Sequence, residues 1–189
     1  MIKSDEHRFY RYLSGSGLKG VDFMGLVDEQ LILIEVKNYE DRFNKDGHSP
    51  ATAILDQPQF YAEKFVQKFT DSFRLIRIVQ QHHQRQFWYR LLYPLFKRFP
   101  IFRFKQSDWY FWSKAFQILE SSPKNVQLWL WLEMGSGTQA KDQNSLEDQL
   151  YKFIKGQFDG DPYQICIHNH KQTSTTMGIQ VRLNSKEKT

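Results

Sequence analysis

An apolar segment that contains charged residues constrains the fold of this chain more than any other feature. In KGVDFMGLVDEQLILIEVKNY, residues 19–39, the apolar residues cluster over 20–27 and again over 31–37. Two short apolar runs separated by a polar turn are typical of strands that are buried on both faces. Three charged residues interrupt these runs: Asp22, Glu35 and Lys37.

The turn of this hairpin decides which residues face each other. With Asp28 and Glu29 as the turn, the numbers of paired residues sum to 57, as they also do for a four-residue loop. Asp22 then lies directly opposite Glu35, and Glu35 shares a strand face with Lys37. Only an odd loop or a bulge would change this register. Two opposed carboxylates repel each other, so we expect a compensating cation, either Lys37 or a divalent metal ion.

The hairpin resembles the PD-(D/E)XK nuclease superfamily, whose members have a restriction-endonuclease-like fold. Asp22 matches the first acid of the superfamily motif. The D/E-X-K element on the neighbouring strand is matched by Glu35, Val36 and Lys37. Val21 stands where proline often precedes the first acid of the family.

The resemblance covers about residues 4–65 and implies an α/β fold in one domain over residues 1–189. Its restriction-endonuclease-like core would have a mixed central sheet flanked by helices, with a basic, aromatic-rich helical insertion at about 74–120. The superfamily often places a further acid on the preceding helix, and Glu6 is the matching residue on a helix expected over about 5–13. An acid near a helix start also has a purely structural explanation, because it interacts favourably with the helix dipole.

A second motif points to the RecB-like branch of the superfamily. That branch carries Q-x-x-x-Y on the helix after the D/E-X-K strand, and QPQFY supplies Gln57 and Tyr61, twenty residues after Lys37. The spacing of four residues puts both side chains on one face of a helix that begins near Asp56. The resemblance implies that they orient groups near the site or contact the nucleic-acid backbone. An ordinary helix start and a core tyrosine are the alternative.

The chemistry that the resemblance implies is metal-assisted hydrolysis of a phosphodiester. Asp22, Glu35 and the carbonyl of Val36 would hold Mg²⁺, or Mn²⁺ in its place, and the ion would polarise the phosphate and acidify a bound water. Lys37 would orient that water or stabilise charge developing on the phosphate, and the sequence does not choose between the two roles. A surface hairpin with a solvated acid–base pair is the competing explanation, which the apolar flanks disfavour.

A basic, aromatic-rich stretch lies between Arg74 and Lys105. It contains eight Lys and Arg residues and no Asp or Glu, in a chain of formal net charge +5. Basic residues interleaved with aromatic rings suit single-stranded or distorted nucleic acid. They also suit an anionic membrane surface or a packing subdomain with a charged rim. The candidate nucleic-acid contacts are Arg85, Trp88, Arg90, Lys97 and Arg98.

The rest of the pattern completes an α/β chain of 189 residues, of which 40% are hydrophobic. Residues 40–54 are polar and predict a loop, and Ser145 predicts the start of a helix that ends near Gly156. The other expected elements are a helix from near Asp56 past residue 70, a helix over 108–120, and strands over 126–133 and 163–170. With one cysteine, no signal-type leader and no spanning apolar run, the sequence predicts a soluble, cytoplasmic protein.

We therefore expect a Mg²⁺-dependent nuclease that acts on DNA in repair, recombination or defence. The alternative is a non-catalytic module of the same fold that binds nucleic acid, an anionic membrane surface or a partner protein. The sequence leaves open DNA against RNA as substrate, the mode of cleavage, and whether the protein forms a homo-oligomer.

Overall fold

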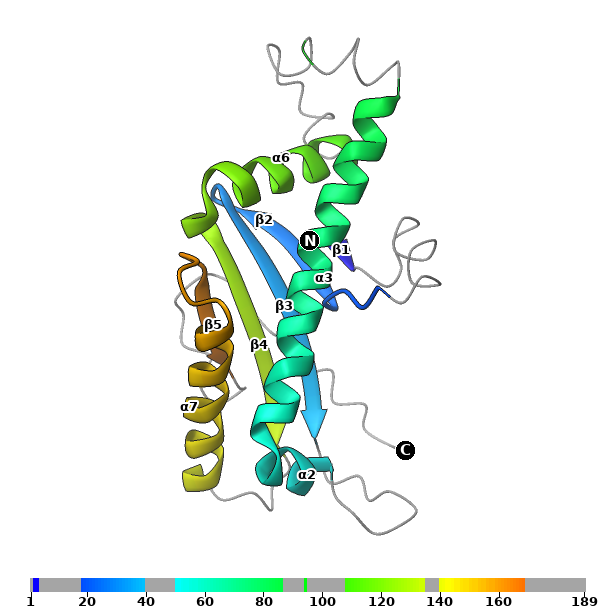
Figure 1. Ribbon diagram of the computed structural model, residues 1–189. Coiled ribbons are helices and arrows are strands. Elements are labelled where there is room, and N and C mark those ends of the chain that lie inside the picture. Colours follow the sequence, from blue (N-terminus) through cyan, green and yellow to red (C-terminus); the bar gives the residue numbers. More distant parts are fainter. Residues whose placement is uncertain are drawn as a thin grey trace, which may run out of the picture.

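A mixed five-stranded sheet forms the centre of the molecule (Figure 1). The computed structural model describes residues 2–3, 18–39, 50–86, 94, 108–134 and 140–168. Within these residues the strands lie in chain order across the sheet: β1 (Ile2–Lys3), β2 (Phe23–Val27), β3 (Gln30–Tyr39), β4 (Val126–Met134) and β5 (Gln164–His168). The pairs β1–β2 and β2–β3 are antiparallel, whereas β3–β4 and β4–β5 are parallel. The expected α/β class and mixed sheet are thereby confirmed.

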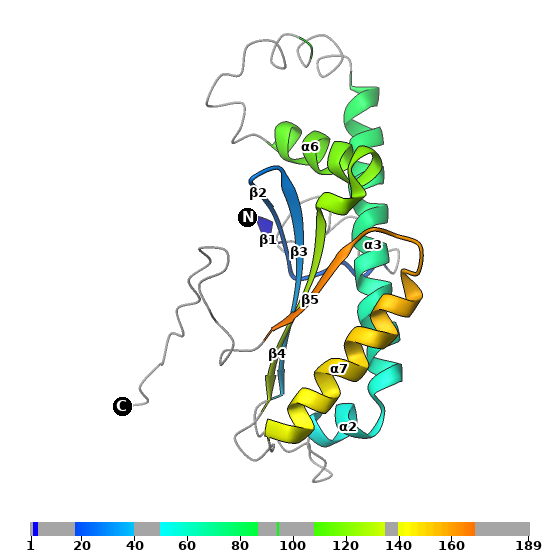
Figure 2. The ribbon, with the colours of Figure 1, turned by 90° about the vertical axis from the view of Figure 1, so that its left-hand side faces the viewer.

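The long described helices, α3 and α7, lie on one side of this sheet (Figure 2). The helices are α2 (Pro50–Asp56), α3 (Pro58–Arg85), α6 (Asp108–Ser121) and α7 (Ala140–Gln157), with a short 3₁₀ turn, η2 (Pro123–Asn125), before β4. They lie in the connections from β3 to β4 and from β4 to β5, because parallel neighbours require long crossovers. Among the described helices, none is both long and apolar enough to cross a membrane.

α3 is the longest described helix, and its sequence explains why one side is buried. Pro58 occupies its first turn, where a missing N–H costs nothing. Apolar side chains recur every three or four residues and lie in the main core: Ala62, Phe65, Phe69, Phe73, Ile76 and Val79. At about 1.5 Å per residue the helix is about 42 Å long, so it runs along the whole sheet (Figure 1).

The β2–β3 hairpin has the register that the sequence predicts. Pairing runs from Phe23 with Ile34 to the turn, and the paired residue numbers sum to 57 throughout. The turn consists of Asp28 and Glu29, whose φ angles are 45° and 63°. Two successive left-handed residues define a type I′ turn, the turn whose twist matches that of the flanking strands.

Side chains alternate between the two faces of β3, and this alternation determines where its charged residues lie. Leu31 and Leu33 belong to the main core beneath the helices. Glu35 and Lys37 follow them at the same spacing of two, so they also face the helices. The opposite face carries a smaller apolar cluster with three buried residues: Ile32, Ile34 and Trp129. The sheet is thus buried on both faces, as the continuous apolar run predicts.

The prediction of a loop over residues 40–54 is wrong for its last part, residues 50–54. The chain is helical from Pro50, where α2 begins. Ala51 and Ile54 are both buried and are three residues apart, so they form the inner face of this short helix. Residues 40–49 lie outside the described residues.

The start of α7 also differs from the expectation. The helix begins at Ala140 rather than at Ser145. Its inner face extends before Ser145, because Gln143 and Glu147 are buried one turn apart on the same side as Leu150. Gln143 Nε2 donates to Glu147 Oε1 at 3.1 Å. Because these two buried positions carry polar residues, the apolar periodicity of the sequence does not extend to the first turns of α7.

Residues 74–120, expected as a helical insertion, are described mainly at their two ends. Residues 74–85 are the last turns of α3, and residues 108–120 lie in α6. Both helices contribute buried side chains to the main core. Apart from Pro94, residues 87–107 lie outside the described residues.

The left-handed turn supplies a test of the hairpin. Asp28→Val should lower the free energy of unfolding by about 1–2 kcal/mol, because a β-branched residue is strained at positive φ. Asp28→Asn should stay within about 0.5 kcal/mol of the original protein, since asparagine tolerates this conformation. Chemical denaturation measures both values, and equal stabilities of the two variants would contradict the turn type.

Candidate active site

Glu35 is buried more completely than any other charged residue that the structure describes. Its side chain has no exposed area and lies on the helix-covered face of β3. Lys37 of the same strand places its Nζ 2.5 Å from Glu35 Oε1. Lys68 of α3 places its Nζ 2.6 Å from the same oxygen. A buried carboxylate must be paired to be tolerated, and here two ammonium groups from separate elements pair with it.

The second oxygen of this carboxylate has a different environment. Glu35 Oε2 is buried and has no hydrogen-bond partner in the described part of the chain. An unsatisfied buried acceptor costs about 1–3 kcal/mol, and native structures contain few such atoms. Oε2 is therefore available to a cation or a water molecule.

Asp22 lies where the pairing of β2 with β3 stops. Continuing the register by one step places it opposite Glu35. Its Oδ2 accepts the backbone N–H of Val36 at 2.8 Å, a bond that a backbone carbonyl would make if the ladder continued. Because a strand residue directs its N–H and C=O toward the same neighbour, the carbonyl of Val36 is expected on the side of Asp22. The three residues thus occupy adjacent positions at the end of the hairpin.

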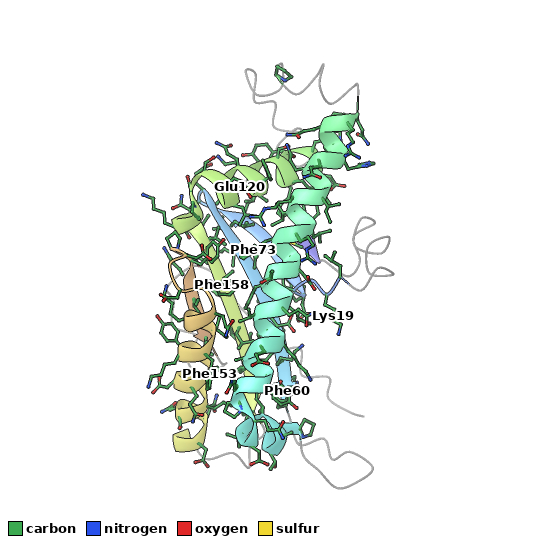
Figure 3. The ribbon with its side chains drawn as sticks, in the orientation of Figure 1. Lys19, Phe60, Phe73, Glu120, Phe153 and Phe158 are labelled. Carbon is green, nitrogen blue, oxygen red and sulfur yellow. The ribbon has the colours of Figure 1, made fainter. Side chains whose placement is uncertain are left out.

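α3 holds the segment that leads into β2. Ser72 Oγ accepts the N–H of Val21 at 2.9 Å and donates to the carbonyl of Lys68 at 2.9 Å. Asp71 Oδ2 accepts the N–H of Lys19 at 3.1 Å, and Figure 3 shows Lys19 beside this helix. The helix that supplies Lys68 therefore also fixes the chain just before the first acid.

Two tyrosines, Tyr39 and Tyr61, lie near each other beyond Lys37. Tyr39 follows by two residues on β3, and its ring centroid lies 6.3 Å from that of Tyr61 on α3, in an edge-on arrangement. Burial is the main cause that raises the pKa of Tyr39, and the nearby Tyr61 and Glu35 raise it further. The hydroxyl of Tyr39 consequently stays protonated at neutral pH.

The two residues of the Q-x-x-x-Y match have different environments. Tyr61 is half-buried and packs against the main core, whereas Gln57 is exposed and has non-helical backbone angles. Gln57 is the N-cap of α3 rather than a residue within it, because Pro58 begins the helix, and its carbonyl accepts the N–H of Tyr61 at 3.4 Å. Gln57 lines a shallow surface cavity together with Phe60 of α3 and Phe153 of α7 (Figure 3).

Most of the expected nucleic-acid contacts cannot be placed in the fold. Five expected site residues lie outside the described residues: Glu6, Trp88, Arg90, Lys97 and Arg98. Arg85 is exposed in the last turn of α3. Two other cations of the basic stretch form ion pairs within the fold, Arg74 with Asp71 at 3.5 Å and Arg77 with Glu120 at 2.7 Å.

Lys68 is the site residue that the sequence patterns did not identify. It lies between Phe65 and Ser72 in a stripe that repeats every three or four residues from Tyr61 to Ile76. All the other members of this stripe are buried or half-buried. A lysine within a buried stripe is a signal that a carboxylate faces it, because Lys is rarely buried without a partner.

Metal-binding side chains do not by themselves identify the site. Among the described residues, no group of three or more His, Cys, Asp or Glu side chains is close enough together to hold a metal ion.

Comparison of the chain with protein-family models, with curated proteins and with solved structures found no match. Function is therefore inferred from the chemistry of the hairpin and of α3.

Tyr39 gives the fold a measurable pH dependence. Because its pKa is raised, the folded protein keeps a proton that the unfolded chain releases above about pH 10. Below that pH, Tyr39 makes its full contribution to the free energy of unfolding. This contribution falls as the pH rises toward the pKa of the folded state, by at most about 1.4 kcal/mol per pH unit. Tyr39→Phe should flatten this fall in urea denaturation.

The matched control is Tyr151→Phe, which changes an exposed tyrosine of α7. This control should lose stability above about pH 10 as steeply as the original protein does. An equally steep loss in Tyr39→Phe would contradict the raised pKa of Tyr39.

Proposed function

We propose that this protein is a Mg²⁺-dependent nuclease that hydrolyses phosphodiester bonds in DNA, in repair, recombination or defence. It would have a restriction-endonuclease-like core of the PD-(D/E)XK type. The observation that carries the proposal is the buried, unpaired Oε2 of Glu35, on a carboxylate held by Lys37. This carboxylate lies at the end of the hairpin, beside the position where Asp22 accepts the N–H of Val36.

The donor atoms fit a hard divalent cation. Glu35 Oε2, the second oxygen of Asp22 and the carbonyl of Val36 are all oxygens, the ligands that Mg²⁺ and Mn²⁺ take. Asp22 uses Oδ2 for the N–H of Val36, and its Oδ1 makes no hydrogen bond within the described part of the chain. When bound, such an ion polarises the phosphate and lowers the pKa of a bound water.

The side chains of the hairpin would have separate tasks. The side chain of Lys37 is 31% exposed, so part of it reaches solvent while its ammonium group pairs with Glu35. It would donate to the attacking water or to a phosphate oxygen as negative charge develops. Asp22 is oriented by a backbone N–H rather than by a lysine, which leaves its charge available to a cation.

The order and pairing of the strands also support the proposal. Residues 35–39 of β3 pair with β4 but, among the described strands, not with β2. The β2–β3 ladder therefore ends before Glu35 and Lys37, and this end of the hairpin, where Lys37 is partly exposed, is the proposed approach for a phosphate. The antiparallel hairpin and the following helix α3 are the elements that the resemblance implies.

Cleavage of labelled DNA with Mg²⁺ or with a chelator tests the proposal. We expect the cleavage rate to fall at least about a hundredfold in each of three variants: Asp22→Asn, Glu35→Gln and Lys37→Met. Each variant loses either a metal ligand or a cation that stabilises the transition state. Asp28→Asn, in the turn of the same hairpin, is the control and should cleave normally.

Calorimetry with Mg²⁺ separates these roles. Asp22→Asn and Glu35→Gln should weaken metal binding, whereas Lys37→Met should not. Full cleavage by all three variants, or cleavage that a chelator does not stop, would sink the assignment.

A non-catalytic binding module is the second candidate, and one observation favours it. Lys37 and Lys68 already balance the charge of Glu35, so the cluster needs no metal for charge neutrality. A folded protein that binds DNA, an anionic membrane surface or a partner protein, but cleaves nothing with Mg²⁺ or Mn²⁺, would support this candidate.

The basic stretch between Arg74 and Lys105 is the proposed substrate surface. The test variant changes four residues of this stretch to Ala: Arg85, Arg90, Lys97 and Arg98. It should bind all DNA sequences more weakly, by about the same factor, and its binding should depend less on salt, because each phosphate contact releases counterions. Lys152→Ala is the control, since Lys152 is an exposed residue of α7 outside this stretch. Fluorescence anisotropy over a salt series measures the effect. Loss of binding to anionic vesicles with unchanged DNA affinity would contradict it.

A further inference from the structure

We propose that Lys68 is a second substrate-contacting cation, which moves from Glu35 to the scissile phosphate when Glu35 binds a divalent cation. The inference rests on the proposed nuclease function and extends it to a residue on α3 that lies outside the hairpin motif. Its basis is the arrangement of two ammonium groups around a single carboxylate oxygen.

The two lysines compete for one atom. The Nζ atoms of Lys37 and Lys68 lie 2.5 Å and 2.6 Å from Glu35 Oε1, so they are at most about 5 Å apart. Two positive charges at this separation repel each other, and a single carboxylate compensates only one of them. One ammonium group is therefore in excess at Glu35 itself, and it suits an incoming anion.

The charges of the site match the reaction when Lys68 is included. Asp22 and Glu35 carry two negative charges and the two lysines carry two positive charges, so the set is neutral by itself. A divalent cation on the carboxylates brings the set to a charge of +2. A phosphodiester attacked by hydroxide carries a charge of −2 in its transition state, which this set complements.

The position of Lys68 allows this change of partner. Its side chain is 24% exposed, so part of it reaches solvent although its partner Glu35 is buried. Its backbone is fixed in α3, where Ser72 Oγ donates to its carbonyl. A flexible four-carbon stem on a fixed backbone lets the ammonium group move by several ångström without disturbing the helix.

Competition for Glu35 gives Lys68→Met two effects of opposite sign. Removing an ammonium group that competes for the carboxylate should tighten Mg²⁺ binding about threefold to tenfold. Removing a phosphate contact should weaken DNA binding about tenfold, the loss typical of one charge-assisted hydrogen bond at a part-exposed site. A residue that only supports packing would not strengthen one ligand and weaken the other.

Lys64→Met is the matched control. Lys64 lies one turn earlier on α3, is exposed, and places its Nζ 3.9 Å from the ring centroid of Phe60 rather than near Glu35. Lys68→Arg is the charge-retaining variant. It should keep DNA affinity within about threefold of the original protein, because the guanidinium group also donates to phosphate oxygens.

The experiment measures Mg²⁺ binding by calorimetry and binding of a labelled oligonucleotide by anisotropy. The second measurement uses Ca²⁺, which takes the same oxygen ligands. Opposite shifts in Lys68→Met, with neither shift in Lys64→Met, support the proposal. Unchanged affinities in Lys68→Met, or shifts of the same sign, overturn it.

Two further comparisons keep the test decisive. If Lys68→Met does not fold, Glu35→Gln is compared with Glu35→Gln/Lys68→Met, in which no buried charge is left unpaired. About tenfold weaker DNA binding by the double variant supports the proposal, and equal binding overturns it.

Cleavage by the original protein is scored separately. Absence of cleavage ends the nuclease assignment, whereas cleavage together with unchanged affinities in Lys68→Met ends only the role of Lys68.

Discussion

The pairing of one buried carboxylate with two lysines is the interaction on which the position of α3 along β3 depends. Glu35 has no exposed side-chain area, and its partners come from two elements, Lys37 from β3 and Lys68 from α3. Leaving such a charge without a partner costs about 3–5 kcal/mol, so α3 must cross β3 at the helical turn that carries Lys68. Apolar contacts are non-directional. The ion pairs therefore fix the position of the helix along the strand in a way that the apolar core alone does not.

α3 satisfies this constraint with polar residues among its buried apolar ones. Lys68 and Ser72 lie one turn apart, between the buried rings of Phe65 and Phe73. Ser72 is fully buried, yet its hydroxyl is satisfied as a donor to the carbonyl of Lys68 and as an acceptor from the N–H of Val21. The helix can consequently pack on the sheet and still hold the chain that enters β2. A site whose supporting hydrogen bonds come from a helix is held more rigidly than one supported by loops alone.

Features set by neighbours in the sequence were predictable, and features set by distant contacts were not. The hairpin register, β4 and α6 follow from alternation, a two-residue turn and helical periodicity. Lys68 could not be matched to Glu35 because 33 residues separate them, and a single lysine in an amphipathic helix is usually a surface charge. The start of α7 was missed for a related reason, since Gln143 and Glu147 satisfy each other in buried positions. The N-cap position of Gln57 was also not foreseen, because α3 begins at Pro58 rather than near Asp56.

The two faces of β3 indicate that the fold does not need this charged cluster. On one face Ile32 and Ile34 pack in an apolar cluster, whereas on the other face Leu33 is followed by Glu35 and its lysines. Apolar residues of similar volume in place of a buried ion pair are often neutral or stabilising, by about 1–4 kcal/mol. Glu35 in addition keeps one oxygen unsatisfied. The strand therefore retains a carboxylate at a cost in stability. That cost is borne where the β2–β3 ladder ends and the side chains of both lysines are partly exposed, a coincidence that favours chemistry, rather than packing, as the role of Glu35.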